Sequence, residues 1–372
     1  MRFLSVTHEL PTCMVTNEDV VSGVRAASAA HLSADELDVL GVLLQRLFAS
    51  TGTTVRYHRA DGERAVDVAL RAGRRALDRA GLDPGEIDLL IYVGIGRGIL
   101  EPASGTIFTD LLGLTNATTF DVLDACASWM RALHLAKLYL DAGVHRNIMI
   151  VNAEFEGREA HRYELRSLAE FEHWHPSVTI GEAATATIVT ADPTGDGGDD
   201  FRIDFRTSGD RRTLCFIPLP NVDEYFGTDT VARYGIPPLQ FASFGMRLME
   251  AGAQQLVTHY RERPEFKDFD PEIVFGHAAS DGMSRLIAQE VGLDLDLLRL
   301  HHKDFANCVS ASIPMAMSHA LEEGALRDGM RVLLLMASAG VTTGLASFTF
   351  HGPHDRPHDR ADRTREPEGA PA

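Results

Sequence analysis

Cys126 is the residue of this sequence best suited to covalent chemistry. It lies between an extended run over residues 118–123 and a helical pattern over residues 130–140. A thiol in the first turn of a helix faces the positive end of the helix dipole and unpaired backbone N–H groups, and both favour the nucleophilic thiolate. Because a lone cysteine is more often a small buried hydrophobe, the interpretation depends on the rest of the chain.

The second half of the chain repeats the first. Counting back from the glycines that end two predicted helices, Cys126 lies 17 residues before Gly143 and Asn307 lies 17 residues before Gly324. We therefore predict that Cys126 and Asn307 hold equivalent places in two copies of one βαβ unit, with the two helix starts facing each other across a pseudo-twofold axis. The other matching segments are 83–91 with 270–276, and 147–151 with 331–336.

His277 directly follows a predicted strand over residues 273–276. It therefore lies at the carboxyl end of that strand, where open α/β folds place their ligand crevices. A lone histidine after a strand is more often structural. Here an imidazole at a strand end joins a thiol and a carboxamide at two helix starts, and together they indicate a catalytic site.

The pattern of apolar residues predicts an α/β fold made of βαβ units, which imply mostly parallel sheets covered by helices. We predict a helix over residues 64–80 and an amphipathic helix over residues 33–54. The predicted parts of the chain are an N-terminal half with the cysteine (1–195), a C-terminal half with the histidine and asparagine (196–352), and a disordered tail with almost nothing to bury (353–372).

Composition and charge exclude several classes of function. The net charge of −18 would repel a phosphate backbone, so nucleic-acid binding is not expected. No apolar run reaches the roughly 18 residues that span a bilayer, and the N-terminus lacks the pattern of a signal peptide. The four cysteines are scattered without metal-binding spacing, so we expect no metal or other cofactor and the reduced thiols of a cytoplasmic protein.

The chain resembles the thiolase superfamily, specifically β-ketoacyl-ACP synthase III and its relatives. The resemblance covers most of residues 1–350 and implies a five-layer αβαβα fold built from two duplicated halves. The segments that carry it are Leu10-Pro11, residues 15–19, Thr51-Gly52 with Arg56, residues 86–90, the cysteine segment 124–130, Gly181–Ala184, His277–Ser280, Asn307–Pro314 and Ser338–Gly340.

The resemblance also implies a mechanism. Cys126 attacks the thioester of acyl-CoA or acyl-ACP and holds the acyl group as a new thioester. Backbone N–H groups at Cys126 and near Ala339 and Gly340 bind the oxyanion. His277 and Asn307 donate hydrogen bonds to the carbonyl oxygen of a second thioester. The enolate formed there attacks the acyl-cysteine in a Claisen condensation and gives a β-keto product.

The chain departs from the family pattern at three points. The asparagine that the family often carries in its histidine motif is absent from His277–Ser280, and the closing loop Ala337–Gly340 is not glycine-rich. The tryptophan segment that helps type III synthases to hold CoA has no counterpart. These departures change the pocket lining and point away from standard fatty-acid initiation.

Glu101 suggests a different acceptor. The segment Leu100–Ser104 resembles that of relatives that join two acyl chains head to head. In those relatives the glutamate reaches across the dimer interface as the base on the second chain, because no malonyl carboxylate leaves to generate the carbanion. The alternative is a loop glutamate that caps a helix before Pro102, and the sequence leaves both open.

The leading hypothesis is a condensing enzyme of lipid or secondary-metabolite (polyketide) biosynthesis. The alternative is an acyltransferase that passes the acyl group to a hydroxyl, amine or carrier thiol without forming a C–C bond. Asn307 favours condensation, and the intact cysteine, histidine and asparagine disfavour a catalytically silent subunit. We expect the segments 155–176 and 205–245 to shape the acyl tunnel.

The expected partners are acyl-CoA, an acyl carrier protein and a second copy of this chain, because the family buries a large dimer interface near the cysteine helix. An acidic carrier would need a local basic patch on this acidic protein. Such a patch could come from one predicted helix, which otherwise presents a solvated face. Its basic residues are Arg71, Arg74, Arg75 and Arg79.

Overall fold

The computed structural model describes residues 1–155, 162–191, 200–227, 235–277 and 279–352, and in these ranges it contains two five-stranded sheets. The strands of the first sheet lie in the order β1 (Arg2–Glu9), β7 (Ala183–Thr190), β6 (Asn147–Glu154), β4 (Leu89–Val93) and β5 (Thr118–Val122). Those of the second lie in the order β12 (Leu298–Arg299), β11 (Ile273–His277), β13 (Arg331–Ser338), β14 (Thr342–Thr349) and β8 (Arg202–Thr207).

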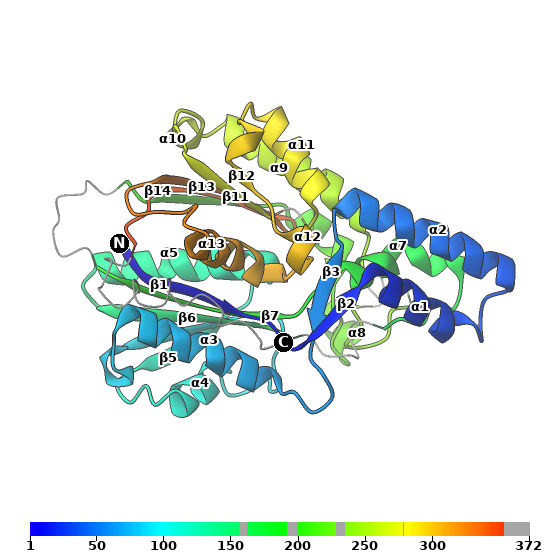
Figure 1. Ribbon diagram of the computed structural model, residues 1–372, viewed down its shortest axis with the longest axis horizontal. Helices are drawn as coiled ribbons and strands as arrows, with labels where there is room; N and C mark the ends of the chain where they lie inside the picture. Colours follow the sequence, from blue (N-terminus) through cyan, green and yellow to red (C-terminus); the bar gives the residue numbers. More distant parts are fainter. Residues whose placement is uncertain (156–161, 192–199, 228–234, 278, 353–372) are drawn as a thin grey trace, which may run out of the picture.

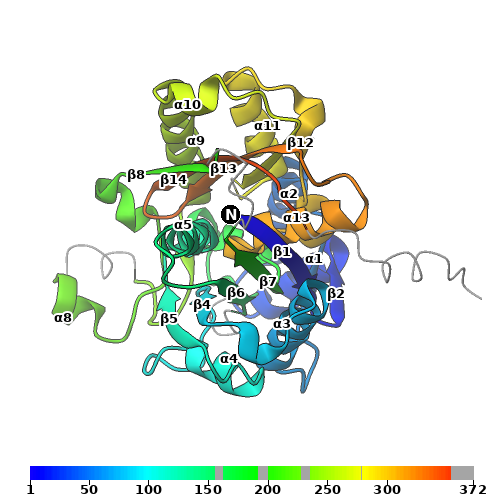
Figure 2. The same ribbon diagram turned by 90° about the vertical axis from the view of Figure 1, so that its left-hand side faces the viewer.

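Helices separate and cover the two sheets, so that the molecule has five layers (Figures 1 and 2). Trp129 and Met317, from the two central helices, pack in one buried cluster with strands of both sheets. The αβαβα fold predicted from the thiolase resemblance is confirmed. The central layer holds α5 (Ser128–Asp141) and α13 (Ser312–Glu322), the first sheet is covered by α3 (Ala65–Ala80) and α4 (Gly105–Leu111), and the second by α9 (Gly245–Arg261), α10 (Pro264–Lys267) and α11 (Asp281–Glu290).

Both sheets are mixed, so the prediction of mostly parallel sheets was wrong. β4 runs parallel to β5 and β6, and β11 runs parallel to β12 and β13, as βαβ units require. β7 and β14 then run antiparallel to β6 and β13, and β1 and β8 add further antiparallel edges. In the second sheet the reversal follows from the short turn over residues 339–341, because a connection of that length can join only antiparallel strands.

The two copies of the βαβ unit match at an offset of 184 residues, and Asn307 is therefore not the counterpart of Cys126. At this offset β4 matches β11, β6 matches β13, and the turn Ala125–Ala127 matches Val309–Ala311. The counterpart of Cys126 is Ser310. The prediction failed because α13 has 11 residues where α5 has 14, so counting back from the glycines displaced the alignment by three residues.

A helical extension lies at one end of the molecule (Figure 1). Its α2 (Ala34–Thr51) lies within the helix predicted over residues 33–54. Ser33 and Glu36 form a capping box at its start, and the left-handed Gly52 ends it. The remaining elements are α1 (Asn17–Ser28), α7 (Phe171–Trp174), α8 (Val222–Phe226), α12 (His302–Phe305), β2 (Cys13–Thr16), β3 (Val55–His58), β9 (Cys215–Phe216) and β10 (Ala242–Ser243).

The predicted boundary between residues 195 and 196 and the predicted disordered tail, 353–372, both lie outside the described residues. The division into two halves therefore stays a prediction, although each sheet draws its strands from one side of that boundary. Within the described ranges, the helices lack the combination of length and apolar character that a membrane span requires.

Candidate active site

Cys126 lies in a 3₁₀ turn, Ala125–Ala127, directly before α5. Ser128 fixes this turn, because its Oγ accepts the N–H of Asp124 (2.8 Å) and donates to the carbonyl of Ala125 (2.8 Å). Ala125 has a φ of 45°, a conformation that is uncommon for a residue with a side chain and often marks functional sites. The structure thus places the thiol at a helix start, as predicted, and leaves it partly exposed.

Asn307 is held in a fixed orientation with its amide nitrogen available. Its Oδ1 accepts the N–H of Val309 (2.9 Å), which leaves Nδ2 as the donor. Its backbone accepts from Gly181 (2.9 Å) and donates to Thr179 (3.1 Å), so the segment before β7 holds it in place. Gly181 is required there because a Cβ on it would lie 2.7 Å from the carbonyl oxygen of Phe305.

His277 ends β11 and is 1 % exposed. Its ring stacks with those of His301 and His302 at centroid distances of 6.4 and 6.3 Å, and His302 Nδ1 lies 2.9 Å from Asp281 Oδ1. Neither ring nitrogen of His277 has a hydrogen-bond partner in the described part of the chain. Burial lowers the pKa of His277 to about 3, so the ring is neutral and offers one N–H donor.

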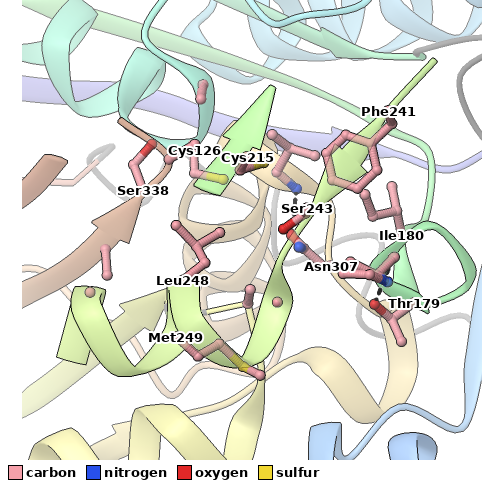
Figure 3. A pocket seen from close by; sticks show the side chains of 18 of the residues that line it. Cys126, Thr179, Ile180, Cys215, Phe241, Ser243, Leu248, Met249, Asn307 and Ser338 are labelled. Carbon is pink, nitrogen blue, oxygen red and sulfur yellow. Dashed lines mark hydrogen bonds between the residues drawn. The ribbon is translucent and has the colours of Figure 1, made fainter. Parts of the chain in front are cut away.

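Cys126, Asn307 and Ala339 line one largely apolar cavity, and Figure 3 shows the first two among its wall residues. The cavity has about 890 Å³ of empty space, its open mouth included. His277 and Gly340 are not among its described lining residues, although Ala279 is. Leu248 and Met249 of α9 form another wall of the cavity. The segment 205–245, expected to shape the acyl tunnel, contributes Cys215, Phe241 and Ser243, and Thr179 and Ile180 follow shortly after the other such segment, 155–176.

In the second half, a carboxylate accepts hydrogen bonds at the helix start that corresponds to the one at Cys126. Ser310 donates its N–H to Glu154 Oε1 (3.1 Å) and its hydroxyl to the same oxygen. Glu154 ends β6, and its counterpart at the end of β13 is Ser338, whose hydroxyl donates to the carbonyl of Asp124 (3.3 Å). Glu154 therefore occupies the helix start at Ser310, whereas the helix start at Cys126 faces the cavity.

Glu101 lies outside this cavity, exposed on the loop before α4. At the start of α4 the N–H groups of Ser104 and Gly105 donate to Asp121 (2.8 and 3.0 Å). Asp121 rather than Glu101 therefore caps that helix, and the capping alternative was wrong. A role for Glu101 across a dimer interface stays a prediction.

Two residues that the sequence did not single out, His175 and Cys215, line the same cavity. Cys215 lies on β9, paired with Ser243 of β10. His175 begins the 3₁₀ turn His175–Thr179. No local pattern marks either residue, since both reach the cavity through long-range packing. The available signal was the group of histidines around Trp174 in a segment expected to shape the tunnel.

Two family models match the chain, and together they include the three predicted catalytic residues. The model described as 3-oxoacyl-[acyl-carrier-protein (ACP)] synthase III matches residues 120–209, which contain Cys126. The model of the C-terminal part of the same synthase matches residues 262–350, which contain His277 and Asn307.

Curated relatives of known name agree with these matches. β-Ketoacyl-[acyl-carrier-protein] synthase III of Neisseria meningitidis serogroup C is 28% identical over 298 residues, which are 80% of this chain and 87% of the relative. The enzyme of the same name from Sulfurimonas denitrificans is 27% identical over 308 residues, 81% of this chain and 88% of the relative.

Solved structures show the same fold at lower identity. OleA from Xanthomonas campestris has a TM-score of 0.79 and 19% identity, covering 94% of this chain and 96% of that chain. 3-Oxoacyl-[acyl-carrier-protein] synthase III from Aquifex aeolicus has a TM-score of 0.73 and 21% identity, covering 94% and 99%. By its family models, its relatives and its fold, this chain is similar to the β-ketoacyl-ACP synthase III-like enzymes of the thiolase superfamily.

Proposed function

We propose that this protein loads an acyl group from acyl-CoA or acyl-ACP onto Cys126 and joins it to a second thioester by Claisen condensation. One observation carries the proposal: a thiol at a helix start and an amide whose oxygen is already engaged line the same apolar cavity. A nucleophile and a neutral hydrogen-bond donor facing one space can act on two thioesters in turn.

In the loading step the Cys126 thiolate attacks the carbonyl carbon of the acyl thioester. The oxyanion is bound by backbone N–H groups at Cys126 and near Ala339 and Gly340. The bond to the CoA sulfur then breaks, CoA leaves as a thiolate that takes up the proton released by Cys126, and the acyl chain stays on Cys126 as a thioester. The apolar cavity walls suit an acyl chain.

In the condensation step the acceptor thioester loses carbon dioxide from a malonyl group, or a proton from its α-carbon, and becomes an enolate. The enolate oxygen accepts hydrogen bonds from Asn307 Nδ2 and the N–H of His277. Two neutral donors stabilise this charge without giving up a proton. The enolate carbon attacks the acyl carbonyl, the C–S bond to Cys126 breaks, and a β-keto thioester leaves. Acyl transfer to a hydroxyl, amine or carrier thiol remains the alternative, and it would leave the Asn307 donor without a role.

Three of the four arginines in the patch on α3 already pair with carboxylates, which favours acyl-CoA over a carrier protein as the acyl donor. The ion pairs join Arg71 to Glu9 (3.7 Å) and Glu63 (3.4 Å), Arg75 to Glu9 (3.3 Å) and Glu322 (2.6 Å), and Arg79 to Glu322 (3.0 Å). A carrier docking there would have to displace these carboxylates.

A homodimer is part of the proposal. β5 is an edge strand of the first sheet, and such an edge can pair with a second copy. Leu123, directly after β5, and Leu138, on the adjacent α5, are 60% and 52% exposed. Apolar side chains beside an unpaired edge are typical of a subunit interface.

The experiment is intact-mass spectrometry of the protein after incubation with a panel of acyl-CoAs. The expected result is one acyl adduct, which Cys126→Ala abolishes. Cys13→Ala, a change at an exposed cysteine on β2, is the matched control and should keep the adduct. An adduct that persists in Cys126→Ala would overturn the proposal.

A further inference from the structure

His175 is a buried imidazole whose tautomer is fixed by the backbone. It is 5% exposed, and its Nδ1 lies 2.7 Å from the carbonyl oxygen of Phe171. A carbonyl oxygen can only accept a hydrogen bond, so Nδ1 carries the proton and Nε2 carries the lone pair. The Phe171 ring also stacks on the imidazole at a centroid distance of 5.2 Å, which holds its plane.

The Nε2 atom of His175, which carries the lone pair, lies at the N-terminus of α9. A Cβ built on Gly245, the first residue of α9, would lie 2.7 Å from Nε2, so a glycine is needed to let the ring approach. Burial lowers the pKa of His175, and the positive end of α9 acts in the same direction because it disfavours an imidazolium. The ring is therefore neutral and able to accept a proton.

Within one chain, His175 is the base best placed in the cavity, whereas Glu101 lies outside it and could act only from a second copy. Among the described lining residues, the side chains that can titrate are Cys126, His175 and Cys215, with no carboxylate, lysine or arginine. Cys126 is occupied as the thioester when the acceptor arrives. A thiol carries a proton near neutral pH and must lose it before it can act as a base, whereas a neutral imidazole is ready to accept a proton.

A base has a use in condensation only when the acceptor brings a proton that must be removed. A malonyl acceptor makes its carbanion by losing carbon dioxide and needs no base, whereas a simple acyl thioester must lose a proton from its α-carbon. We propose that His175 Nε2 removes the α-proton of a second acyl thioester, so that this cavity joins two acyl groups without decarboxylation. This inference rests on the proposed acyl loading of Cys126.

The step balances within the site. Nε2 takes the α-proton, and the electron pair moves to the carbonyl oxygen that Asn307 and His277 hold. The α-carbon attacks the acyl carbonyl on Cys126, and the C–S bond breaks. The released Cys126 thiolate takes the proton from the His175 imidazolium, which restores both groups. The net reaction converts two acyl-CoA molecules into one β-ketoacyl-CoA and one CoA.

The test is the loss of deuterium from acyl-CoA labelled at its α-carbon, followed by mass spectrometry in ordinary water. The wild-type enzyme should wash out the label. His175→Gln and His175→Asn, whose amides can still donate to the Phe171 carbonyl, should each slow the exchange at least about 100-fold, the contribution expected of a general base. His173→Gln, at a neighbouring histidine outside the cavity lining, is the control and should exchange normally.

Two parallel readouts separate this inference from the proposed function. The Cys126 adduct and condensation with malonyl-CoA should both fall by less than about tenfold in the two His175 variants, because neither needs the base. Three results would overturn the inference. The exchange could be unchanged in the His175 variants, it could be lost in Cys215→Ser instead, or it could fall only together with adduct formation. Wild-type protein that forms the adduct without exchange would overturn it as well, whereas failure to form any adduct would overturn the proposed function.

Discussion

At the residue scale, burial decides what the histidines of this protein can do. His277 is enclosed at the end of β11, and burial lowers its pKa to about 3. In the proposed mechanism it therefore donates a hydrogen bond near neutral pH without becoming an acid that protonates the enolate. His175, with its proton held by the Phe171 carbonyl, presents a lone pair instead. The same side chain type thus offers a donor at the end of β11 and an acceptor at the cavity wall.

Buried histidines also predict a loss of stability in mild acid. Burial lowers the pKa of His8 on β1 from 6.5 to about 4. Between those pH values the unfolded chain binds a proton that the folded chain excludes, so the free energy of unfolding falls as the pH falls. His8 contributes up to about 1.4 kcal/mol per pH unit to this loss. Replacing it in His8→Gln should flatten the pH dependence, measured by urea unfolding between about pH 7 and about pH 4.

The control for this prediction is Ser318→Ala, which removes the hydroxyl that lies 2.9 Å from His8 Nδ1 but keeps the titrating ring. It should lower stability at every pH and leave the pH dependence in place. If His8→Gln shows the wild-type slope, burial of His8 does not contribute to the acid lability.

At the scale of elements, the site depends on how closely two loops approach each other. The segment before β7 and the segment before α13 form a parallel bridge between Ile180 and Asn307. This contact aims the Asn307 amide into the cavity, and it requires a glycine at position 181. The helix that carries Cys126 is positioned separately, by the turn that Ser128 holds.

Gly181→Ala is therefore expected to disturb both stability and condensation. The new methyl group would lie 2.7 Å from the Phe305 carbonyl oxygen, so the backbone must shift, at a cost of about 1–3 kcal/mol in the free energy of unfolding. Condensation should fall more than acyl loading, because Asn307 moves while Cys126 does not. Gly98→Ala, where a Cβ meets nothing within 4 Å, is the matched control. Equal stability of the two variants in urea unfolding would show that the contact is not tight.

At the scale of the whole molecule, the sequence predicted what depends on local pattern and missed what depends on length and distance. The helix start at Cys126 and the strand end at His277 follow from apolar periodicity next to a chemical side chain, and the structure places both there. The duplication was visible, but its register was wrong because α13 is three residues shorter than α5. The mixed sheets and the cavity walls at His175 and Cys215 could not be predicted, because they depend on how distant segments pack.

Duplication also explains why the molecule has one candidate site where it has two similar helix starts. Glu154 closes the start at Ser310, while Ser338 in the matching place leaves the start at Cys126 facing the cavity. The second half is then free to supply the donors rather than a second nucleophile. In the proposed mechanism the thiol comes from one predicted half, and the amide and imidazole come from the other.

The measurement that tests this account most directly compares acyl loading with condensation in Asn307→Ala. The account predicts that the Cys126 adduct still forms, while the β-keto product falls about 100- to 1,000-fold, as expected when one donor to a developing oxyanion is lost. Asn116→Ala, at a surface amide that bonds the Gly85 carbonyl, should leave both steps unchanged. If acyl loading falls as far as condensation in Asn307→Ala, or if the product forms at the wild-type rate, Asn307 is not the enolate donor and the account is contradicted.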